Sequence, residues 1–563
     1  MRRHTPTWAL ALAVPLALLI LPEPTYAQSA GARGVVIASE RAASEAGLAI
    51  LRKGGSAADA AVAAAMVLIV VAPQSASPGG DGAALSYRAS DRSIEAWDGT
   101  ATAPAAAGSD LFIGRDGKPM TLDAVRPGGR AVGVPGAIRM LESLHKAQGT
   151  LTWAHIVAPA IEIAEKGFPI SPALARTLAE TDAAPLPDIR GDLRPNTITP
   201  NASTPSATTL LRNAPLANTL RQVAASGADA VMRGEVATDI ATTVRTDASP
   251  GLLTADDLAA YTSPPHKPLC TPYHGLLVCS PGGASLGGVE LARSLGVLDH
   301  TPLPRLDPAG AQASMLLLRA WQASRYEVAA SLTDSEFAPD AIATLTNPVR
   351  LAADAHALET GNGKPTRLLI NDSPPMLAPE TSGAVVLVVD GEGNAVSLSL
   401  SLHSRFGARL LVHGFALNDA LAGFAPLPVV NGHQLPNRVE GGKHPLSAMA
   451  PAIVLDPRGR LRFVVGAEAG EEGVAQEAQM LLHTIDFHQS PSAAAAAPMW
   501  RLRDGALELE DGVGARLLLD LLRQSGTAPR LVPRAGHAAL IAWFESGAEG
   551  APTMPSEMGF GRQ

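Results

Sequence analysis

The sequence predicts an α/β protein of stacked helix and sheet layers, an α+β layered arrangement. Helical patterns come first along the chain and paired strand patterns dominate afterwards, which favours stacked layers over a doubly wound nucleotide-binding fold. With 563 residues, the chain is long enough for one large domain or two closely packed ones. Its glycine pairs lack the spacing and the strand-to-helix context of a dinucleotide or phosphate loop.

The first half of the chain reads mainly as helices. A short strand over 34–40 precedes an amphipathic helix over 41–55, and a second helix over 56–73 begins with Ser56 and Asp59 at capping-box spacing. That second helix is Ala-rich and apolar on nearly all sides, so we expect it in the middle of the fold. We expect further elements as follows: a strand pair over 79–89 and 93–104, helices over 153–184 with Pro at their boundaries, and a surface excursion over 186–205.

The second half returns to helices over 234–261 and 287–299 and then turns to strands. Residues 361–380 are turn-rich and polar. A buried strand of mostly β-branched residues follows over 385–389, then a tight turn over 390–394 and a strand with period-two alternation over 395–402. No internal repeat with a fixed period is present. A hydroxyl residue at the start of the first of these strands, such as Thr381 or Ser382, is either a nucleophile or an ordinary polar strand end.

Cys270 and Cys279 are the only cysteines in the sequence. They flank the segment TPYHGLLV, in which His274 and Gly275 can form a two-residue hairpin turn. In that register the two cysteines face each other as a non-hydrogen-bonded pair, with the closer Cα approach that a bridge needs. We therefore predict a disulfide between Cys270 and Cys279, with two buried free thiols as the alternative, and no metal site.

Residues 1–27 have the pattern of a secretory signal peptide. Arg2 and Arg3 precede an apolar run over 8–21, and small residues over 25–27 offer a cleavage site. No later segment has the uninterrupted apolar length of a membrane span. The sequence thus predicts a secreted or periplasmic protein that has no membrane association after signal removal. The net charge of -9 and the lack of a basic cluster exclude nucleic acid as a partner.

Seven segments between about residues 34 and 487 resemble, in the same order, the γ-glutamyltransferase (γ-glutamyltranspeptidase, or glutathione hydrolase) family. They read ASEAGLAILRKGGSAADAAVAAA, SPGGDGA, DGTATAPAAA, AVGVPGAIRMLESLHKAQGTLTWAHIVAPAIEIAEKGFPIS, GLLTADDLAAY, DGEGNAVSLSLSLHSRFG and GGKHPLSAMAPAIVL. The resemblance implies an N-terminal-nucleophile hydrolase fold, an αββα four-layer sandwich. Members are made as one precursor and cut themselves before a Thr, whose hydroxyl becomes the nucleophile and whose freed α-amine is the base.

The resemblance implies a division of this chain at the cleavage point. Residues 28–380 would form a large-subunit-like region, and residues 381–563 a small-subunit-like region that carries the nucleophile strand. An alignment without a gap puts Gly383 at the nucleophile position, and Gly has no hydroxyl. Two extra residues in the strand put Thr381 there and keep the same side-chain face. The His that follows the family nucleophile has no counterpart, since Ser382 and Gly383 stand there.

At the other site positions of the family, this chain keeps some of the family's residues and replaces others. Ser401 keeps a hydroxyl that supports the nucleophile, and the paired oxyanion glycines correspond to Ala469 and Gly470. Ser447 and Ala448 replace a Ser pair that binds the substrate carboxylate, and His403 replaces an Asn near the site. Thr100 stands at the family's carboxylate-binding Arg, and Gly423 stands at the acidic residue that receives the substrate ammonium. Arg405 or Arg409 can replace the missing Arg from the same loop.

Three hypotheses follow for the activity. The chain is an exported γ-glutamyl hydrolase or transpeptidase with Thr381 as its nucleophile, it is a related amidase on a non-zwitterionic acyl group, or it is an uncleaved binding protein. The second hypothesis follows from Thr100 and Gly423, because an unpaired charge in a buried site costs several kcal/mol. The resemblance implies no cofactor, and small-molecule amides as substrates. Introducing Thr100→Arg and Gly423→Asp together is expected to raise turnover of γ-glutamyl compounds.

Overall fold

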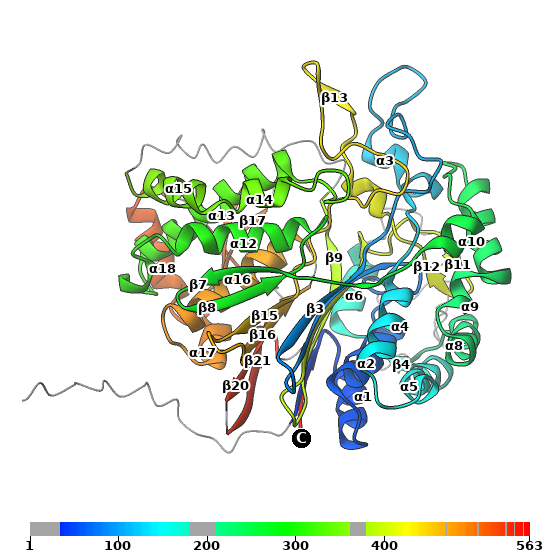
Figure 1. Ribbon diagram of the computed structural model, residues 1–563, viewed down its shortest axis with the longest axis horizontal. Helices are drawn as coiled ribbons and strands as arrows, with labels where there is room; N and C mark the ends of the chain where they lie inside the picture. The colour runs from blue at the N-terminus through cyan, green and yellow to red at the C-terminus, as the bar shows by residue number, and fades with distance from the viewer. Residues whose placement is uncertain are drawn as a thin grey trace, which may run out of the picture.

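Two antiparallel sheets lie face to face at the centre of the molecule, between two layers of helices (Figure 1). This is the αββα four-layer arrangement that the sequence predicts. The computed structural model describes residues 34–180, 210–360, 379–468, 470–503, 506–527, 529–534, 538–544, 546–555 and 557–563.

The first sheet contains the strand that begins next to Thr381. Its seven strands are, in spatial order, β22 (Gly559–Arg562), β1 (Val35–Ala38), β9 (Ser382–Val389), β10 (Ala395–His403), β2 (Asp81–Arg88), β3 (Ser93–Gly99) and β6 (Pro265–His266). Strands β9 and β10 lie in the middle and are joined by the predicted turn over 390–394. Both are buried along their whole length.

The second sheet packs on the first through apolar side chains. Its six strands are, in spatial order, β21 (Gly547–Pro552), β20 (Ala538–Phe544), β16 (Leu461–Ala467), β15 (Ala452–Leu455), β8 (Leu276–Ser280) and β7 (Leu269–Tyr273). Val385 and Leu387 of β9 meet Val464 of β16 in the core between the sheets. Gly466 permits this close approach, because a Cβ there would lie 2.9 Å from the Val385 side chain.

One helical layer covers the outer face of the first sheet. Its main helices are α1 (Arg41–Arg52), α2 (Ala57–Val71), α4 (Ala137–Gln148), α5 (Trp153–Lys166), α8 (Ala214–Ser226) and α10 (Gly234–Thr246). Helix α2 is buried at every position, as its apolar composition predicts. Its capping box is also confirmed: the Asp59 N–H donates to Ser56 Oγ at 3.1 Å, and the Ser56 N–H donates to Asp59 Oδ2 at 2.9 Å.

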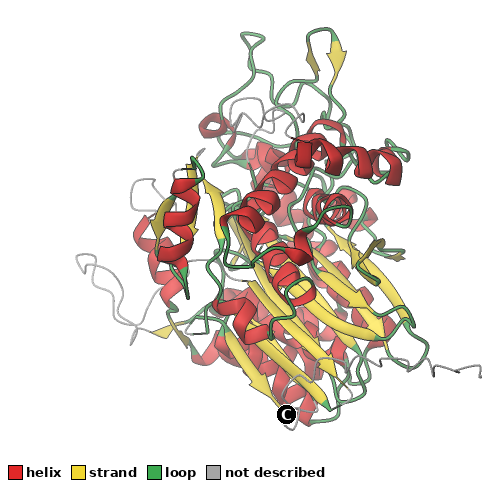
Figure 2. Cartoon of the chain, turned by 90° about the vertical axis from the view of Figure 1, so that its left-hand side faces the viewer, coloured by secondary structure: helices red, strands yellow, loops and turns green. Residues whose placement is uncertain are grey.

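The other helical layer packs on the outer face of the second sheet and faces the viewer in Figure 2. It contains α12 (Leu286–Leu298), α13 (Ala311–Ser331), α14 (Ala341–Leu345), α15 (Pro348–Thr360), α16 (Glu471–Ile485), α17 (Pro491–Ala496) and α18 (Ala515–Gln524), with the small sheet β17 (Trp500–Arg503), β18 (Ala506–Glu510) and β19 (Arg530–Val532) beside them. The remaining short elements are α3 (Leu122–Val125), α6 (Pro172–Glu180), α9 (Asp229–Met232), α11 (Ala255–Ala260), β4 (Phe168–Pro169), β5 (Leu210–Leu211), β11 (Leu411–Val412), β12 (Phe415–Ala416), β13 (Val429–Val430) and β14 (His433–Gln434).

The prediction that prolines bound the helices over 153–184 is partly wrong. Pro172 does begin α6, but Pro159 lies inside α5. Helix α5 continues through it because its inner face, with Ile156, Val157 and Ala160, is fully buried, and this packing outweighs the loss of one backbone hydrogen bond. The predicted signal peptide, the excursion over 186–205 and residues 361–378 lie outside the described residues. None of the described helices has the length and apolar composition needed to cross a membrane.

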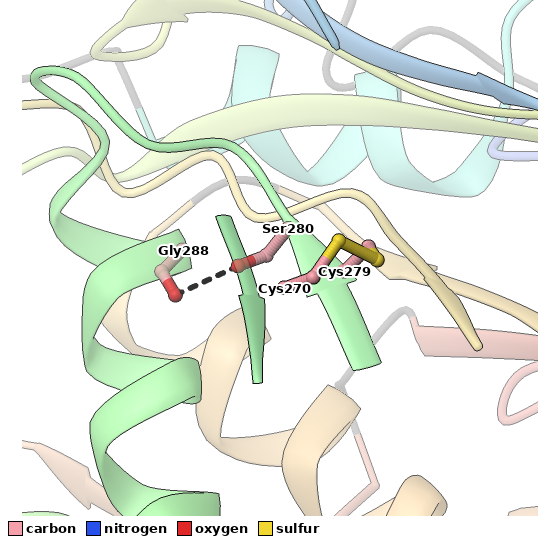
Figure 3. The surroundings of a disulfide bond; sticks show 4 residues. All are labelled: Cys270, Cys279, Ser280 and Gly288. Atoms are coloured by element: carbon pink, nitrogen blue, oxygen red, sulfur yellow. Dashed lines mark hydrogen bonds between the residues drawn. A yellow bond between two sulfur atoms is a disulfide. The ribbon is translucent and has the colours of Figure 1, made fainter. Parts of the chain in front are cut away.

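The hairpin of β7 and β8 has the predicted geometry (Figure 3). His274 and Gly275 both have positive φ, and Cys270 lies opposite Cys279 in the strand register. A disulfide joins the two residues, with their Cα atoms 4.0 Å apart. Next to it, Ser280 Oγ donates to the carbonyl oxygen of Gly288 in α12 at 2.9 Å, which ties the hairpin to the outer helical layer.

Candidate active site

Thr381 lies one residue before β9, at the end of the central strand pair. Its backbone N–H donates to the His403 carbonyl oxygen at 2.8 Å, so Thr381 is fastened to the end of β10. The pairing of β9 and β10 is irregular between Leu400 and His403, where Ser382 lies opposite His403. Bulges of this kind re-aim side chains at strand ends. The Thr381 side chain is exposed, as a nucleophile requires.

Ser382 and Gly383 do not offer a nucleophile in this arrangement. The Ser382 side chain is buried, and its hydroxyl bonds to the Gln74 carbonyl oxygen at 2.8 Å and to Ser75 Oγ at 3.0 Å. Gly383 lies within the buried strand β9. Of the three positions that the sequence leaves open, Thr381 is therefore the one with an accessible hydroxyl.

Ser401 lies beneath the strand end in β10. Its hydroxyl donates to the Ser382 carbonyl oxygen at 2.8 Å and accepts the His403 N–H at 2.8 Å. In the uncleaved chain it thus shapes the irregular end of β10, where Thr381 is attached. His403 is buried and has a φ of 72°, a conformation that this hydrogen bond helps to hold.

Glu380, immediately before Thr381, has a buried side chain whose carboxylate is bound by two donors. Its Oε2 accepts Ser447 Oγ at 3.0 Å and the Ala448 N–H at 2.6 Å. Ser447 and Ala448 are the positions that correspond to the carboxylate-binding Ser pair of the resemblance. In the uncleaved chain this pair of donors, which we call the carboxylate clamp, therefore holds the chain's own Glu380.

Gly470, the residue before α16, lies against the Glu380–Thr381 peptide. A Cβ at Gly470 would stand 3.0 Å from the Glu380 carbonyl oxygen, and the φ of Gly470 is 121°. Only glycine fits such a conformation and approach without strain. The predicted oxyanion residue Gly470 thus lies beside the carbonyl group that a Thr381 nucleophile would attack. The other predicted oxyanion residue, Ala469, lies outside the described residues.

Thr100 lines a cavity of about 640 Å³ that reaches the carboxylate clamp. Asp98, Tyr261, His444 and Ser447 also line it. The Thr100 hydroxyl donates to Asp98 Oδ1 at 2.6 Å and contacts His444 Nδ1 at 2.8 Å. Ser447 therefore belongs both to the cavity wall and to the clamp, so the cavity lies next to the Glu380 side chain. Sequence reasoning missed His444, although it lies in the quoted segment GGKHPLSAMAPAIVL.

Gly423 packs tightly beside His403. A Cβ at Gly423 would stand 2.6 Å from the Leu446 carbonyl oxygen and 3.4 Å from the His403 ring. An acidic side chain there needs a shift of the backbone, so the proposed Gly423→Asp exchange does not fit this structure. The sequence could not show this, because the clash comes from residues 20 or more positions away along the chain.

The two candidate replacements for the missing Arg lie on the loop after β10. Arg405 is exposed, whereas Arg409 is half-buried near Arg126 and Asp419. Burial and the neighbouring Arg126 lower the pKa of Arg409. Arg126, which sequence reasoning missed, pairs with Asp419 at 3.1 Å, and the Ser404 N–H donates to the same carboxylate at 2.9 Å. These contacts stabilise the loop next to His403.

Asp81 is a further buried acid at this end of the sheet that sequence reasoning did not single out. It begins β2, directly opposite Ser401 of β10. Burial raises the pKa of Asp81 well above its ordinary value, and the carboxylates of Glu380, Asp419 and Asp98 raise it further. Burial and the neighbouring carboxylates thus favour the protonated form of Asp81. Among the described residues, no three His, Cys, Asp or Glu side chains form a group that could hold a metal ion.

The chain is similar to known proteins over most of its length. The glutathione hydrolase proenzyme of Escherichia coli (strain K12) is 29% identical over 475 residues, which cover 83% of this chain and 80% of that protein. The acylase ACY 1 proenzyme of Pseudomonas sp. (strain SE83) is 28% identical, with 92% of this chain and 91% of that protein covered. A cephalosporin acylase from Bacillus halodurans has the same fold, with a TM-score of 0.77 at 23% identity over 95% of this chain and 99% of that one.

The family model for gamma-glutamyltranspeptidase matches residues 43–556, which is most of the chain. The matched span contains the strand pair, the clamp and the cavity described above. The relatives are enzymes of the N-terminal-nucleophile hydrolase class. The chain is a member of the gamma-glutamyltranspeptidase family.

Proposed function

We propose that the protein is a precursor that cuts itself between Glu380 and Thr381, and that Thr381 then acts as the nucleophile of an amide hydrolase or acyltransferase. The observation that carries this proposal is the exposed Thr381 at the end of β9, with the preceding carbonyl group against Gly470. The cut divides the chain into a region over 28–380 and a region over 381–563. These two fragments of one precursor stay together through the first sheet, in which β9 and β10 pair with β1 and β2.

Cleavage requires only the chain and one water molecule. Thr381 Oγ1 attacks the Glu380 carbonyl carbon, the C–N bond breaks, and the proton of the hydroxyl passes to the Thr381 nitrogen. Water then hydrolyses the resulting ester, which leaves a carboxyl group on Glu380 and a free α-amine and hydroxyl on Thr381.

The mature enzyme uses the same atoms on a substrate amide. The free amine takes the proton from Thr381 Oγ1 as the oxygen attacks, and the proton then goes to the departing amine. Gly470 stands beside the place where negative charge develops on the carbonyl oxygen. The acyl-enzyme passes to water or to an amino acceptor.

The preferred acyl group is one that ends in a carboxylate and carries no ammonium beside it. The carboxylate clamp accommodates one carboxylate, as Glu380 demonstrates. The carboxylate of a glutamate side chain is separated from its own backbone carbonyl by Cα, Cβ and Cγ, the same separation as between the two ends of a glutaryl group. Gly423 has no side chain to pair with an ammonium and no room for one. The similarity to the acylase ACY 1 proenzyme of Pseudomonas sp. is compatible with an acyl group other than γ-glutamyl.

A γ-glutamyl group is the second candidate, because it is a glutaryl group with an ammonium beside the carboxylate. The names of other relatives, glutathione hydrolases, favour it. The chain prefers the γ-glutamyl group over the glutaryl group only if one of its side chains pairs with that ammonium.

The test compares a glutaryl anilide with a γ-glutamyl anilide on the purified mature protein. An unpaired charged group in a closed site costs about 1.5–3 kcal/mol, so we expect kcat/KM to be about 10- to 150-fold higher for the glutaryl compound. A higher kcat/KM for the γ-glutamyl compound would show that another side chain pairs with the ammonium. A protein that stays in one piece and hydrolyses neither compound would instead favour the binding-protein hypothesis.

We also infer export from residues 1–27. The basic start, the apolar run and the small residues before position 28 support a cleaved signal peptide. Expression with the native start, followed by N-terminal sequencing of the periplasmic or medium fraction, tests this inference. A cytoplasmic protein that retains residues 1–27 would contradict it.

A further inference from the structure

The Glu380 side chain is buried and hydrogen-bonded, although the next residue, Thr381, is exposed. The Glu380 side chain is 6% exposed, whereas that of Thr381 is exposed. Its carboxylate accepts two hydrogen bonds, from Ser447 Oγ and from the Ala448 N–H. Ser447 is itself anchored, since the adjacent Ala448 carbonyl region packs against Gly287 at the start of α12 and the Ser447 N–H donates to the Ala284 carbonyl oxygen at 3.1 Å. The clamp is therefore tied to the segment that leads into α12.

The peptide that follows Glu380 is held at two further points. Its carbonyl oxygen lies against Gly470, and its N–H, that of Thr381, donates to the His403 carbonyl oxygen. The Glu380 side chain is thus hydrogen-bonded to the clamp and the Thr381 N–H to the end of β10, while the Glu380 carbonyl oxygen packs against Gly470, just before α16. A reaction between neighbouring atoms is fast only when such groups are held in a suitable orientation.

We propose that Glu380 is a positioning residue for the cleavage of the bond that follows it, through the attachment of its carboxylate to Ser447 and Ala448. The proposal rests on the proposed self-cleavage at Thr381. Glu380 does not take part in the bond changes. It fixes the carbonyl carbon within reach of Thr381 Oγ1, and it occupies the clamp until cleavage releases it.

The length of the side chain makes the proposal specific. A Gln at position 380 has the same length and keeps an oxygen that accepts both hydrogen bonds, although without charge. An Asp keeps the charge but is one methylene shorter and does not reach the clamp from the same backbone position. If the length of the side chain matters, the rate of self-cleavage falls in the order Glu, Gln, and then Asp and Ala at similar rates. If only the negative charge matters, the Asp variant cleaves faster than the Gln variant.

The experiment measures how fast the chain that begins at Thr381 appears, by intact mass, in the variants Glu380→Gln, Glu380→Asp and Glu380→Ala. We expect the Asp and Ala variants to cleave about 10- to 150-fold more slowly than the natural chain, with Gln in between. Ser447→Ala removes one donor from the other side of the contact and is expected to slow cleavage too. Adding it to Glu380→Ala should cause little further loss, because the contact is already absent.

Two controls separate positioning from faulty folding. Glu45→Ala changes an exposed glutamate in α1 and should cleave at the natural rate. Each Glu380 variant is also made with Thr381→Ala, which prevents cleavage, so that the melting temperatures of the uncut chains can be compared. Similar melting temperatures combined with slow cleavage support the proposal.

The outcomes distinguish this proposal from the proposed function. If the natural chain cleaves and Glu380→Ala cleaves at the same rate, or if Asp is faster than Gln, the positioning role is overturned and self-cleavage stands. If the natural chain does not cleave at Thr381, the proposed function is overturned, and the role of Glu380 with it.

Discussion

At the scale of single residues, burial separates two neighbouring hydroxyl groups that look equivalent in the sequence. Thr381 is exposed at the strand end, and Ser382 is buried with its hydroxyl bonded to Gln74 and Ser75. This difference follows from position: Thr381 lies just outside β9, whereas Ser382 is the first residue of a strand that is buried at every position. Environment, and not residue type, therefore favours Thr381 over Ser382 as the proposed nucleophile.

We expect Thr381→Ala to leave a single chain without hydrolase activity, because no other accessible hydroxyl stands at this position. The natural protein should give two chains of about 36 and 19 kDa, in proportion to its mass of 57.8 kDa. Ser382→Ala should still cleave, with stability lowered by about 1 kcal/mol through the lost hydrogen bonds. Mass spectrometry of the three proteins checks this. Cleavage of Thr381→Ala, or its loss in a well-folded Ser382→Ala, would identify Ser382 as the nucleophile.

At Gly423 the structure contradicts the expectation that an Asp side chain can be introduced. Since a Cβ there meets the Leu446 carbonyl oxygen at 2.6 Å, we expect Gly423→Ala to destabilise the protein by about 1–3 kcal/mol and Gly423→Asp to do so by more. Urea unfolding of both variants measures the loss of stability, with the single variant Thr100→Arg measured alongside them for comparison. Variants at Gly423 as stable as the natural protein would show that the loop of residues 445–446 moves easily and that an acidic side chain can be introduced.

At the scale of elements, the disulfide links two adjacent strands at the edge of the second sheet. It joins residues separated by 9 positions, so the chain-entropy contribution to stability is about 2–3 kcal/mol at most. We expect Cys270→Ser with Cys279→Ser to lower the free energy of unfolding by up to this amount and to leave self-cleavage in place, since the hairpin lies at the edge of the second sheet and β9 belongs to the first. Peptide mapping without reductant and urea unfolding are the measurements. Two alkylated thiols in the exported protein would refute the bridge.

At the scale of the whole molecule, stability depends on buried titratable groups away from the site. Burial raises the pKa of Asp486, which follows α16, to about 6, while the hydrogen bonds from Tyr273 and the nearby His274 lower it. The ordinary value is 3.8, so the folded chain keeps this proton over a range of pH in which the unfolded chain has lost it. The contribution of Asp486 to stability is therefore lost as pH rises from about 4 to about 6.

We expect Asp486→Asn to gain stability relative to the natural protein as pH rises through this range. Between pH 4.5 and pH 7.5 the difference in unfolding free energy between the two proteins changes by about 2 kcal/mol, because each unit of pKa shift corresponds to about 1.4 kcal/mol and about 1.5 units of the shift lie above pH 4.5. Urea unfolding of both proteins at pH 4.5 and pH 7.5 measures it, with Asp520→Asn, an exposed residue of α18, as the matched control. A difference that does not change with pH would contradict the expectation.

His483, in the last turn of α16, acts in the opposite direction. Burial lowers its pKa to about 4 from an ordinary 6.5, so the unfolded chain takes up a proton before the folded chain does. Its contribution to stability is present above pH 6.5 and is lost as pH falls toward 4. In the natural protein, Asp486 lowers the free energy of unfolding as pH rises and His483 raises it over nearly the same pH range. The two effects offset each other, so each is measured with a variant of one of the two residues.

The sequence by itself determined the layered fold, most helices and strands, the facing cysteines and the family. These features depend on patterns that are local in the chain: the apolar run of α2 with its cap, the β-branched strand β9, the His274-Gly275 turn, and the seven ordered segments. Local periodicity and turn chemistry favour such elements through interactions between chain neighbours. The sequence also brought Thr381, Gly470 and Ser447 forward as site residues, through the resemblance.

Only the tertiary structure decided how these residues relate to one another. It showed Glu380 in the carboxylate clamp, Asp81 opposite Ser401, and the Leu446 backbone against Gly423. Each of these contacts joins segments far apart in the chain, where neither spacing nor periodicity carries information. The physical reason is that burial and hydrogen-bond partners, which determine the chemistry of a side chain, come from packing between the layers and not from the chain neighbours.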